Sequence, residues 1–281
     1  MGNPAADRSV VAQSDDLTGK VAIVTGAGSL IACATIEGLV ARGARVLATD
    51  LPESAHHVAE LGLADQVSFA GGELADDAHL RELVTRTRSE LGGVDYLVNA
   101  AAVFADPRLA ATHEDWHRIL DVNVISAARL ISLCQESMAA RGGGAIVNVA
   151  SISGLRAQPD RLLYPVTKAA LLGLTRNCAT LLAAEGTRVN AVLPGWTWSR
   201  NIEKRYGTRA RADEVAAEFQ VMGRLGNPAE IADAIIFLLS PRASFITGAE
   251  LAVDGGYSAM SPEATGQAFI KVPTVNGTAS T

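Results

Sequence analysis

The stretch VAIVTGAGSLIACATIEGLVARGARVLATD, residues 21–50, decides the fold. Its opening run, residues 21–25, is apolar and predicts a buried strand, and residues 46–50 predict a second one. Between them, residues 31–41 have the pattern of a helix, which Gly43 ends. A strand, a helix and a second strand in this order are typical of a βαβ unit, in which the two strands lie parallel.

The same alternation continues along the chain, and no internal repeat or linker rich in proline and glycine interrupts it. We therefore expect a single α/β domain over residues 17–257, a Rossmann-type doubly wound parallel sheet flanked by helices. Residues 1–16 and 258–281 are expected to be flexible ends, and capping of a neighbouring subunit is a second interpretation of the tail. The other expected strands are Val67–Ala70, Tyr96–Asn99, Ala145–Ala150, Arg188–Leu193 and Glu250–Val253, and the other expected helices lie near Trp116–Ala140, Tyr164–Glu185 and Pro228–Leu239.

Size and composition narrow the class of protein. The 281 residues fit one large α/β domain, and the 48% hydrophobic content is ample for its core. A net charge of −6 argues against a nucleic-acid partner. No apolar run is long enough to span a bilayer, and residues 1–16 lack the apolar core of a signal peptide, so we expect a cytoplasmic protein. Cys33, Cys134 and Cys178 are widely spaced and odd in number, which predicts reduced, buried thiols without a metal.

The turn after the first strand predicts a phosphate site. Gly26 follows the strand and opens the helix, which places backbone N–H groups and the positive end of the helix dipole against a pyrophosphate. Gly28 gives the backbone freedom, and the Ser29 hydroxyl can donate to a phosphate oxygen. The N–H groups of Leu30 and Ile31 would face the phosphate, with the leucine side chain turned away.

Asp50 ends the second strand, 24 residues after Gly26. A carboxylate at this place accepts a hydrogen bond from a ribose 2′-OH and repels a 2′-phosphate, so the sequence favours NAD over NADP. The alternative interpretation is an ordinary turn aspartate before Leu51 and Pro52.

Ser151, Tyr164 and Lys168 carry the predicted chemistry. Tyr164 and Lys168 are four residues apart, and residues at this spacing share one face of a helix. An ammonium beside a phenol is expected to lower the phenol pKa, so that the tyrosine can transfer a proton at neutral pH. Ser151 would hydrogen-bond the substrate oxygen that gains or loses this proton.

Together these residues resemble the short-chain dehydrogenase/reductase family in its one-domain, classical form, over roughly residues 17–257. Two glycines of the family's cofactor turn are replaced, by Leu30 and Ala32. The tight spacing of tyrosine and lysine differs from the divergent enoyl-reductase branch. The resemblance implies a catalytic role for Asn123, which would hold a proton-relay water. It also implies cofactor contacts at Tyr164 and Lys168, and at either Thr197 or Ser199. Further cofactor contacts are implied at Glu73, Leu74, Asn99, Ala100, Ala101, Pro194 and Gly195.

The resemblance implies an NAD-dependent oxidoreductase that interconverts a small-molecule secondary alcohol and a ketone. Tyr164 would be the general acid/base, and residues of about 195–227 would form a substrate lid. Trp196 and Trp198 in that lid either line the substrate pocket or pack the lid onto the body. Arg156 and Arg161 either meet an anionic substrate at the pocket rim or are solvated.

The resemblance also implies a homo-oligomer, a tetramer or dimer. The family pairs its long helices across subunits, and the matching helices here carry apolar side chains, although packing within one subunit explains them equally. Two other functions stay open, an NADP-dependent 3-oxoacyl thioester reductase and a nucleotide-binding regulatory protein with weak turnover. The apolar side chains are Leu130, Ile131, Leu171, Leu172 and Leu174.

One further motif, at residues 113–117, has the spacing of a zinc site. Residues 113–117 read His-Glu-Asp-Trp-His, the spacing of a zinc-protease signature. Thr112, Glu114 and Asp115 suit the start of a helix. We therefore expect a solvated helix entrance and no metal.

Overall fold

Every one of the seven expected strands is present in the computed structural model, which describes residues 15–261. The strands form one parallel sheet in the order β3-β2-β1-β4-β5-β6-β7. The Rossmann-type architecture predicted from the sequence is thus confirmed. The strands are β1 (Val21–Thr25), β2 (Arg45–Asp50), β3 (Val67–Gly71), β4 (Tyr96–Asn99), β5 (Ala145–Val149), β6 (Arg188–Pro194) and β7 (Glu250–Val253).

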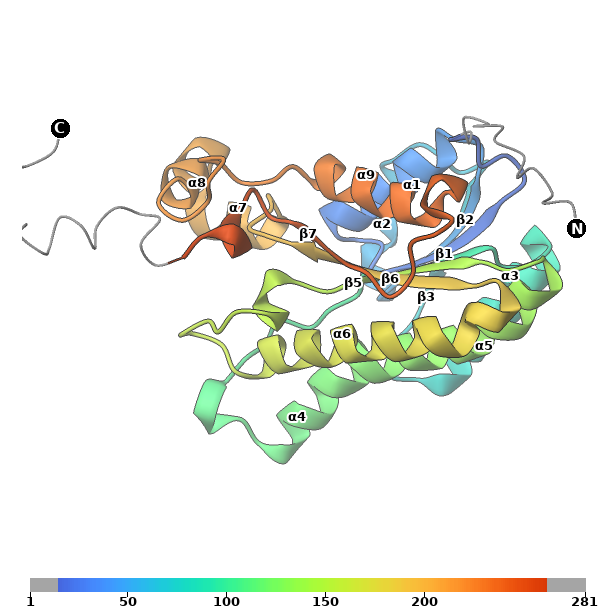
Figure 1. Ribbon diagram of the computed structural model, residues 1–281, viewed down its shortest axis with the longest axis horizontal. Coiled ribbons are helices and arrows are strands. Elements are labelled where there is room, and N and C mark those ends of the chain that lie inside the picture. Colours follow the sequence, from blue (N-terminus) through green and yellow to red (C-terminus); the bar gives the residue numbers. More distant parts are fainter. Residues whose placement is uncertain (1–14, 262–281) are drawn as a thin grey trace, which may run out of the picture.

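Helices cover both faces of this sheet (Figure 1). Helices α1 and α9 pack together on one face, and α3, α5 and α6 lie on the other. The helices are α1 (Leu30–Val40), α2 (Ala55–Ala59), α3 (Asp77–Leu91), α4 (His113–Leu120), α5 (Ser126–Ala140), α6 (Leu163–Leu182), α7 (Arg200–Tyr206), α8 (Arg209–Ala216) and α9 (Pro228–Leu239). No helix within residues 15–261 is long and apolar enough to cross a membrane.

The two core layers explain why the strands are continuous apolar runs. Along β1, Ala22 and Val24 belong to the layer under α1 and α9, whereas Ile23 belongs to the layer under α3 and α5. A strand that is buried on both faces needs apolar side chains at successive positions. Because strand order reverses between β1 and β4, a crevice opens at the carboxyl ends of these strands, where such folds bind their ligands.

Several helices differ from the expectation. The helix expected at Trp116–Ala140 begins three residues earlier, at His113, and is divided by a π-helical turn over Asp121–Ile125. The sequence analysis did not anticipate α3, which Asp76 caps by accepting from Ala78 N, or the short helices α7 and α8. The expected flexible ends lie almost entirely outside the described residues.

Asp95 anchors the opposite end of the sheet. Its side chain is 2% exposed and accepts hydrogen bonds from Lys20 Nζ at 3.1 Å and Val21 N at 2.9 Å. Arg141, beyond α5, forms a 2.8 Å ion pair with the same carboxylate. A buried carboxylate with these partners ties β1, β4 and α5 together.

Asp95→Asn should therefore destabilise the fold by about 2 kcal/mol, because hydrogen bonds to a charged group are lost and two cations lose their counter-ion. Urea denaturation measures the change. Asp233→Asn is the matched control, since Asp233 is 74% exposed and lies 4.0 Å from Arg42, and surface pairs contribute little. Equal unfolding midpoints for the two variants would contradict the anchoring role.

Candidate active site

A cavity of about 1360 Å³ lies at the carboxyl ends of the strands. It brings together nearly all the residues that the sequence analysis assigned to cofactor, catalysis and substrate. Gly28, Asn99 and Asn123 are not part of its wall. The predicted residues that line it are Gly26, Ser29, Leu30, Ile31, Asp50, Glu73, Leu74, Ala100, Ala101, Ser151, Tyr164, Lys168, Pro194, Gly195, Trp196, Thr197, Trp198 and Ser199.

The turn after β1 needs glycine at Gly26. This residue has a φ of +67°, and a Cβ there would lie 2.7 Å from the Ala101 backbone. Ser29 then caps α1, because its Oγ accepts from Ala32 N at 3.2 Å. Leu30 is the first residue of the helix and lies in the cavity wall. The start of α1 therefore opens onto the cavity, which suits an anionic group.

Asp50 is fixed in the cavity wall by the backbone. Its Oδ2 accepts from Gly28 N at 2.8 Å, and its Oδ1 accepts from Leu51 N at 2.7 Å. A Cβ at Gly28 would lie 3.2 Å from Asp50 Oδ2 and 2.9 Å from Ser54. The carboxylate thus stabilises the turn, as expected of an ordinary turn aspartate. It also faces the cavity, as a hydrogen bond to a cofactor ribose would require.

Tyr164 and Lys168 are held inside the protein on α6. Tyr164 is 8% exposed and Lys168 1% exposed, and Lys168 Nζ lies 5.5 Å from the centroid of the tyrosine ring. The ammonium donates to Val149 O at 2.7 Å, so it is tied to the end of β5. Ser151 follows that strand and exchanges hydrogen bonds with Ser153, each 3.1 Å long.

The pKa values of this pair differ from the expectation. Burial raises the pKa of Tyr164 to about 12, against the opposing effects of a hydrogen bond from Ser151 and the charge of Arg161. Burial also lowers the pKa of Lys168 to about 7. The sequence analysis expected the ammonium to lower the phenol pKa, but desolvation of both groups is the larger effect.

Asp106, which was not predicted from the sequence, holds the start of α6, the helix that carries Tyr164 and Lys168. Its Oδ2 accepts from Leu162 N at 2.7 Å and from Tyr164 N at 3.2 Å, at the start of α6. These bonds satisfy N–H groups that a helix start leaves unpaired. Phe104, from the same loop, stacks on the Tyr164 ring with centroids 4.9 Å apart. No local signal links Asp106 to α6, because more than fifty residues separate them.

Asn123 lies in the π-helical turn and is buried. Its Oδ1 accepts from Val103 N at 2.7 Å. Its Nδ2 donates to Val103 O at 3.1 Å and to Thr167 Oγ1 at 3.0 Å. Both amide hydrogens are thus used within the protein, and the side chain ties the loop before α4 to α6. Its part in a proton relay stays a prediction.

The segment expected to be a lid contains α7 and α8. Trp196 and Trp198 both line the cavity, and Trp196 meets Phe219 edge-on with ring centroids 4.6 Å apart. Gln220 Nε2 donates to Trp196 O at 3.2 Å. Both tryptophans therefore line the cavity, and Trp196 also packs against the core of the body. Contact of either side chain with a substrate stays a prediction.

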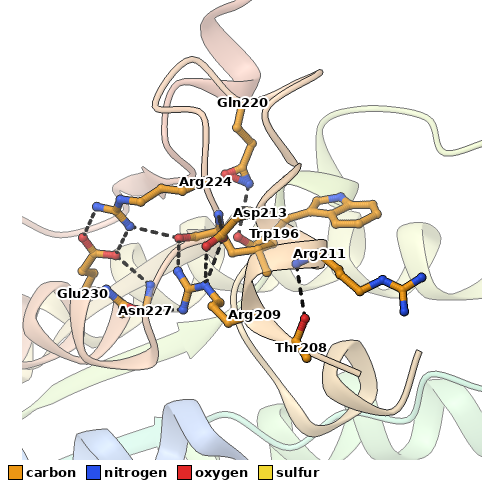
Figure 2. Close-up of polar contacts among 10 residues, drawn as sticks. Trp196, Thr208, Arg209, Arg211, Asp213, Gln220, Arg224, Asn227 and Glu230 are labelled. Carbon is orange, nitrogen blue, oxygen red and sulfur yellow. Dashed lines mark hydrogen bonds and ion pairs between the residues drawn. The ribbon is translucent and has the colours of Figure 1, made fainter. Parts of the chain in front are cut away.

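A network of ion pairs fastens this segment to the start of α9 (Figure 2). Arg209 binds both carboxylate oxygens of Asp213, at 3.0 and 3.1 Å, and reaches Asn227 Oδ1 at 2.8 Å. Arg224 binds both oxygens of Glu230, at 2.9 and 2.7 Å. Paired contacts of this kind fix direction as well as distance, so the aromatic wall of the cavity has a defined position.

Of the remaining sequence candidates, His117 and Arg161 line the cavity, whereas His113 and Arg156 do not. His113 and His117 contact each other through their Nε2 atoms, 2.8 Å apart. Within residues 15–261 no group of three or more histidine, cysteine or acidic side chains could hold a metal ion. Arg156 donates to Ser258 O at 3.1 Å, whereas Arg161 lines the cavity.

Fold and site together define an α/β oxidoreductase that uses a nicotinamide nucleotide. Residues 26–258 match the sequence model of a family described as enoyl-(acyl carrier protein) reductase. The chain belongs to the short-chain dehydrogenase/reductase family.

The similarity to known relatives extends over nearly the whole length of each relative. A cis-4-hydroxycyclohexanecarboxylate dehydrogenase of Sinomonas cyclohexanicum is 39% identical, over 86% of this chain and 97% of the relative. A 3-oxoacyl-(acyl-carrier-protein) reductase of Vibrio cholerae is 35% identical, over 86% and 98%. A 2,5-dichloro-2,5-cyclohexadiene-1,4-diol dehydrogenase of Sphingobium indicum is 34% identical, over 87% and 99%. The crystal structure of levodione reductase superposes with a TM-score of 0.79 at 28% identity, over 87% and 99%.

The burial of Lys168 gives a testable dependence of stability on pH. Its pKa is about 7 in the folded protein and 10.5 ordinarily, so between these values the unfolded chain binds more protons and stability rises with pH. Lys168→Met removes the cost of burying the ammonium. The variant should be more stable than the unmutated protein at pH 6.5, and this advantage should shrink towards pH 9.5. Urea titrations at both pH values measure it, and a constant difference would contradict the assignment.

Proposed function

We propose that this protein oxidises a ring-shaped secondary alcohol to a ketone, or catalyses the reverse reduction, with NAD as its cofactor. One observation carries the proposal. Ser151, Tyr164 and Lys168 share a single cavity with the Gly26 turn and with Asp50. One cavity could therefore hold a nucleotide at the turn and present a substrate to Tyr164.

The residues of the cofactor end fit a nicotinamide dinucleotide. The start of α1 and the Ser29 hydroxyl would bind the pyrophosphate. Asp50 would accept from the adenosine ribose, and Gly195 and Thr197 would hold the nicotinamide. Gly26 lines the cavity, and its missing Cβ lets the turn approach the backbone of Ala100 and Ala101. When bound, the cofactor supplies the hydride acceptor or donor.

The chain itself supplies proton transfer and orientation. Tyr164 Oη would accept the proton of the substrate hydroxyl in oxidation and donate it in reduction. Ser151 Oγ would hydrogen-bond the same substrate oxygen. With a pKa of about 12, Tyr164 keeps its proton at neutral pH in the free protein, which suits ketone reduction. In oxidation the charged form of Lys168 would stabilise the phenolate.

The substrate class rests on the pocket and the relatives. Trp196, Trp198 and Phe219 give the cavity an aromatic wall that suits an apolar ring. The named substrates of two relatives are ring alcohols. The 35% identity to a 3-oxoacyl-(acyl-carrier-protein) reductase favours a second candidate, an NADP-dependent reductase of 3-oxoacyl thioesters. Asp50 weighs against it, because a carboxylate there repels a 2′-phosphate.

We further propose a cytoplasmic homo-oligomer, a tetramer or dimer. The side chains that support it differ from those expected from the sequence. Four side chains that suggested it, Leu130, Ile131, Leu171 and Leu172, are buried in the core of the subunit itself, and Leu174 packs against that core. Packing within one subunit therefore explains these five side chains. Support comes instead from exposed apolar side chains near and on the same helices, Ile125 at 48% and Val166 at 44% exposure.

Tyr164→Phe should lower kcat by about 10²–10⁴-fold, the usual contribution of a positioned acid or base. NADH binding, followed by fluorescence, and the circular dichroism spectrum should stay nearly unchanged. Tyr206→Phe is the matched control, because this tyrosine lines the same cavity on α7. Near-full activity in the Tyr164 variant would remove the proposed mechanism.

Asp50→Asn should narrow a preference for NADH over NADPH by about tenfold or more, since the repulsion of a 2′-phosphate is lost. Fluorescence titration of both nucleotides measures the ratio. Glu73→Gln removes another carboxylate from the same cavity and should leave the ratio nearly unchanged. Tighter binding of NADPH by the unmutated protein would sink the assignment of NAD.

A further inference from the structure

Arg161 lies at the mouth of the cavity, in the loop directly before α6. Its guanidinium carbon is 5.4 Å from the centroid of the Tyr164 ring, and the residue forms part of the cavity wall. Burial raises the pKa of Tyr164, and the positive charge of Arg161 opposes that rise. A cation therefore stands over the ring of the tyrosine that transfers the proton in the proposed reaction.

This cation has no counter-ion in the described part of the chain. Within residues 15–261 the Arg161 side chain makes no ion pair and no hydrogen bond; its contact is with the tyrosine ring. Two carboxylates of the loops around it contact other groups. Asp160 lies 3.8 Å from Arg108, and Asp106 accepts from the backbone at the start of α6. An unpaired guanidinium at a pocket mouth is a ready partner for an anion.

The walls around Arg161 are largely apolar. Phe104 stacks on Tyr164, and on the facing side Phe219 packs between Trp196 and Tyr257, at centroid distances of 4.6 and 6.0 Å. All of these rings belong to the same cavity. A ligand that satisfies both the rings and the guanidinium has an apolar body and one anionic group.

We propose that the substrate carries a carboxylate group, which Arg161 binds while Tyr164 contacts the alcohol or ketone oxygen. This inference rests on the proposed function. The planar guanidinium presents paired N–H donors that match the two oxygens of a carboxylate. The ion pair then decides which end of a ring-shaped substrate faces Tyr164, and it selects against uncharged ring alcohols.

The test compares an acid with its neutral counterpart. Initial rates are measured with cis-4-hydroxycyclohexanecarboxylate and with its methyl ester at saturating NAD. The unmutated protein should prefer the acid by about tenfold or more in kcat/KM, the scale of a hydrogen-bonded ion pair. Arg161→Gln should abolish this preference, mainly by raising KM for the acid, and Arg161→Lys should restore part of it.

A matched control separates the ion pair from indirect effects. Arg156→Gln alters the same loop, but this side chain donates to the Leu155 and Ser258 carbonyls and is not part of the cavity wall, so the preference for the acid should persist. Loss of the Arg161 charge also raises the Tyr164 pKa, and this effect lowers the rates of acid and ester alike. Only a change in their ratio reports the ion pair.

The outcomes separate the two proposals. Equal use of acid and ester by the unmutated protein, or an equal loss for both in Arg161→Gln, overturns the inference and leaves the proposed function standing. If no ring alcohol is turned over, the proposed function fails, and calorimetry decides the inference. Cyclohexanecarboxylate should then bind at least about tenfold more tightly than cyclohexanecarboxamide, and only with Arg161 present. Equal binding of the two would overturn it.

Discussion

The burial of one lysine is the constraint on which the site depends. Lys168 is 1% exposed, and its ammonium donates to Val149 O at 2.7 Å. Removing an ammonium from water is costly, so the surrounding packing must hold it there. That packing joins α6 to the end of β5, and the bond from Asn123 to Thr167 adds the π-helical turn. The same helix carries Tyr164, so whatever seats the lysine also fixes the tyrosine.

The fold was largely predictable, and only part of what was missed has a physical reason. The strands were found because the central ones are buried on both faces, which requires short apolar runs at successive positions. Helix α3 was overlooked although the sequence carries its signal, because Leu80, Leu83, Val84 and Leu91 repeat at helical spacing after the capping residue Asp76. The division of Trp116–Ala140 was not predictable. It accompanies contacts of Asn123 with residues 103 and 167, which a reading of local sequence does not contain.

Parts of the candidate site were likewise predictable from the sequence, and other parts were not. The spacing of Tyr164 and Lys168 on one helix face follows from helix geometry alone, as does the place of Gly26 between strand and helix. The capping of α6 by Asp106 depends on a loop 56 residues away in the chain. The direction of the tyrosine pKa was wrong because the sequence shows the neighbouring charge and not the loss of water around both groups.

Burial pushes both members of the catalytic pair towards their neutral forms, since it raises the pKa of Tyr164 and lowers that of Lys168. A site that transfers protons through Tyr164 needs a nearby positive charge that stays ionised, so that the phenolate is stabilised despite its burial. Arg161 meets that need, because it is exposed at the cavity mouth and still acts on the tyrosine. Asp50 adds the opposite charge to the wall of the same cavity, where we propose that the nucleotide binds. An anionic substrate group on Arg161 would weaken its support of the phenolate, so binding and proton transfer become coupled through one guanidinium. Such coupling favours the protonated tyrosine when an acid is bound, the form that donates to a ketone.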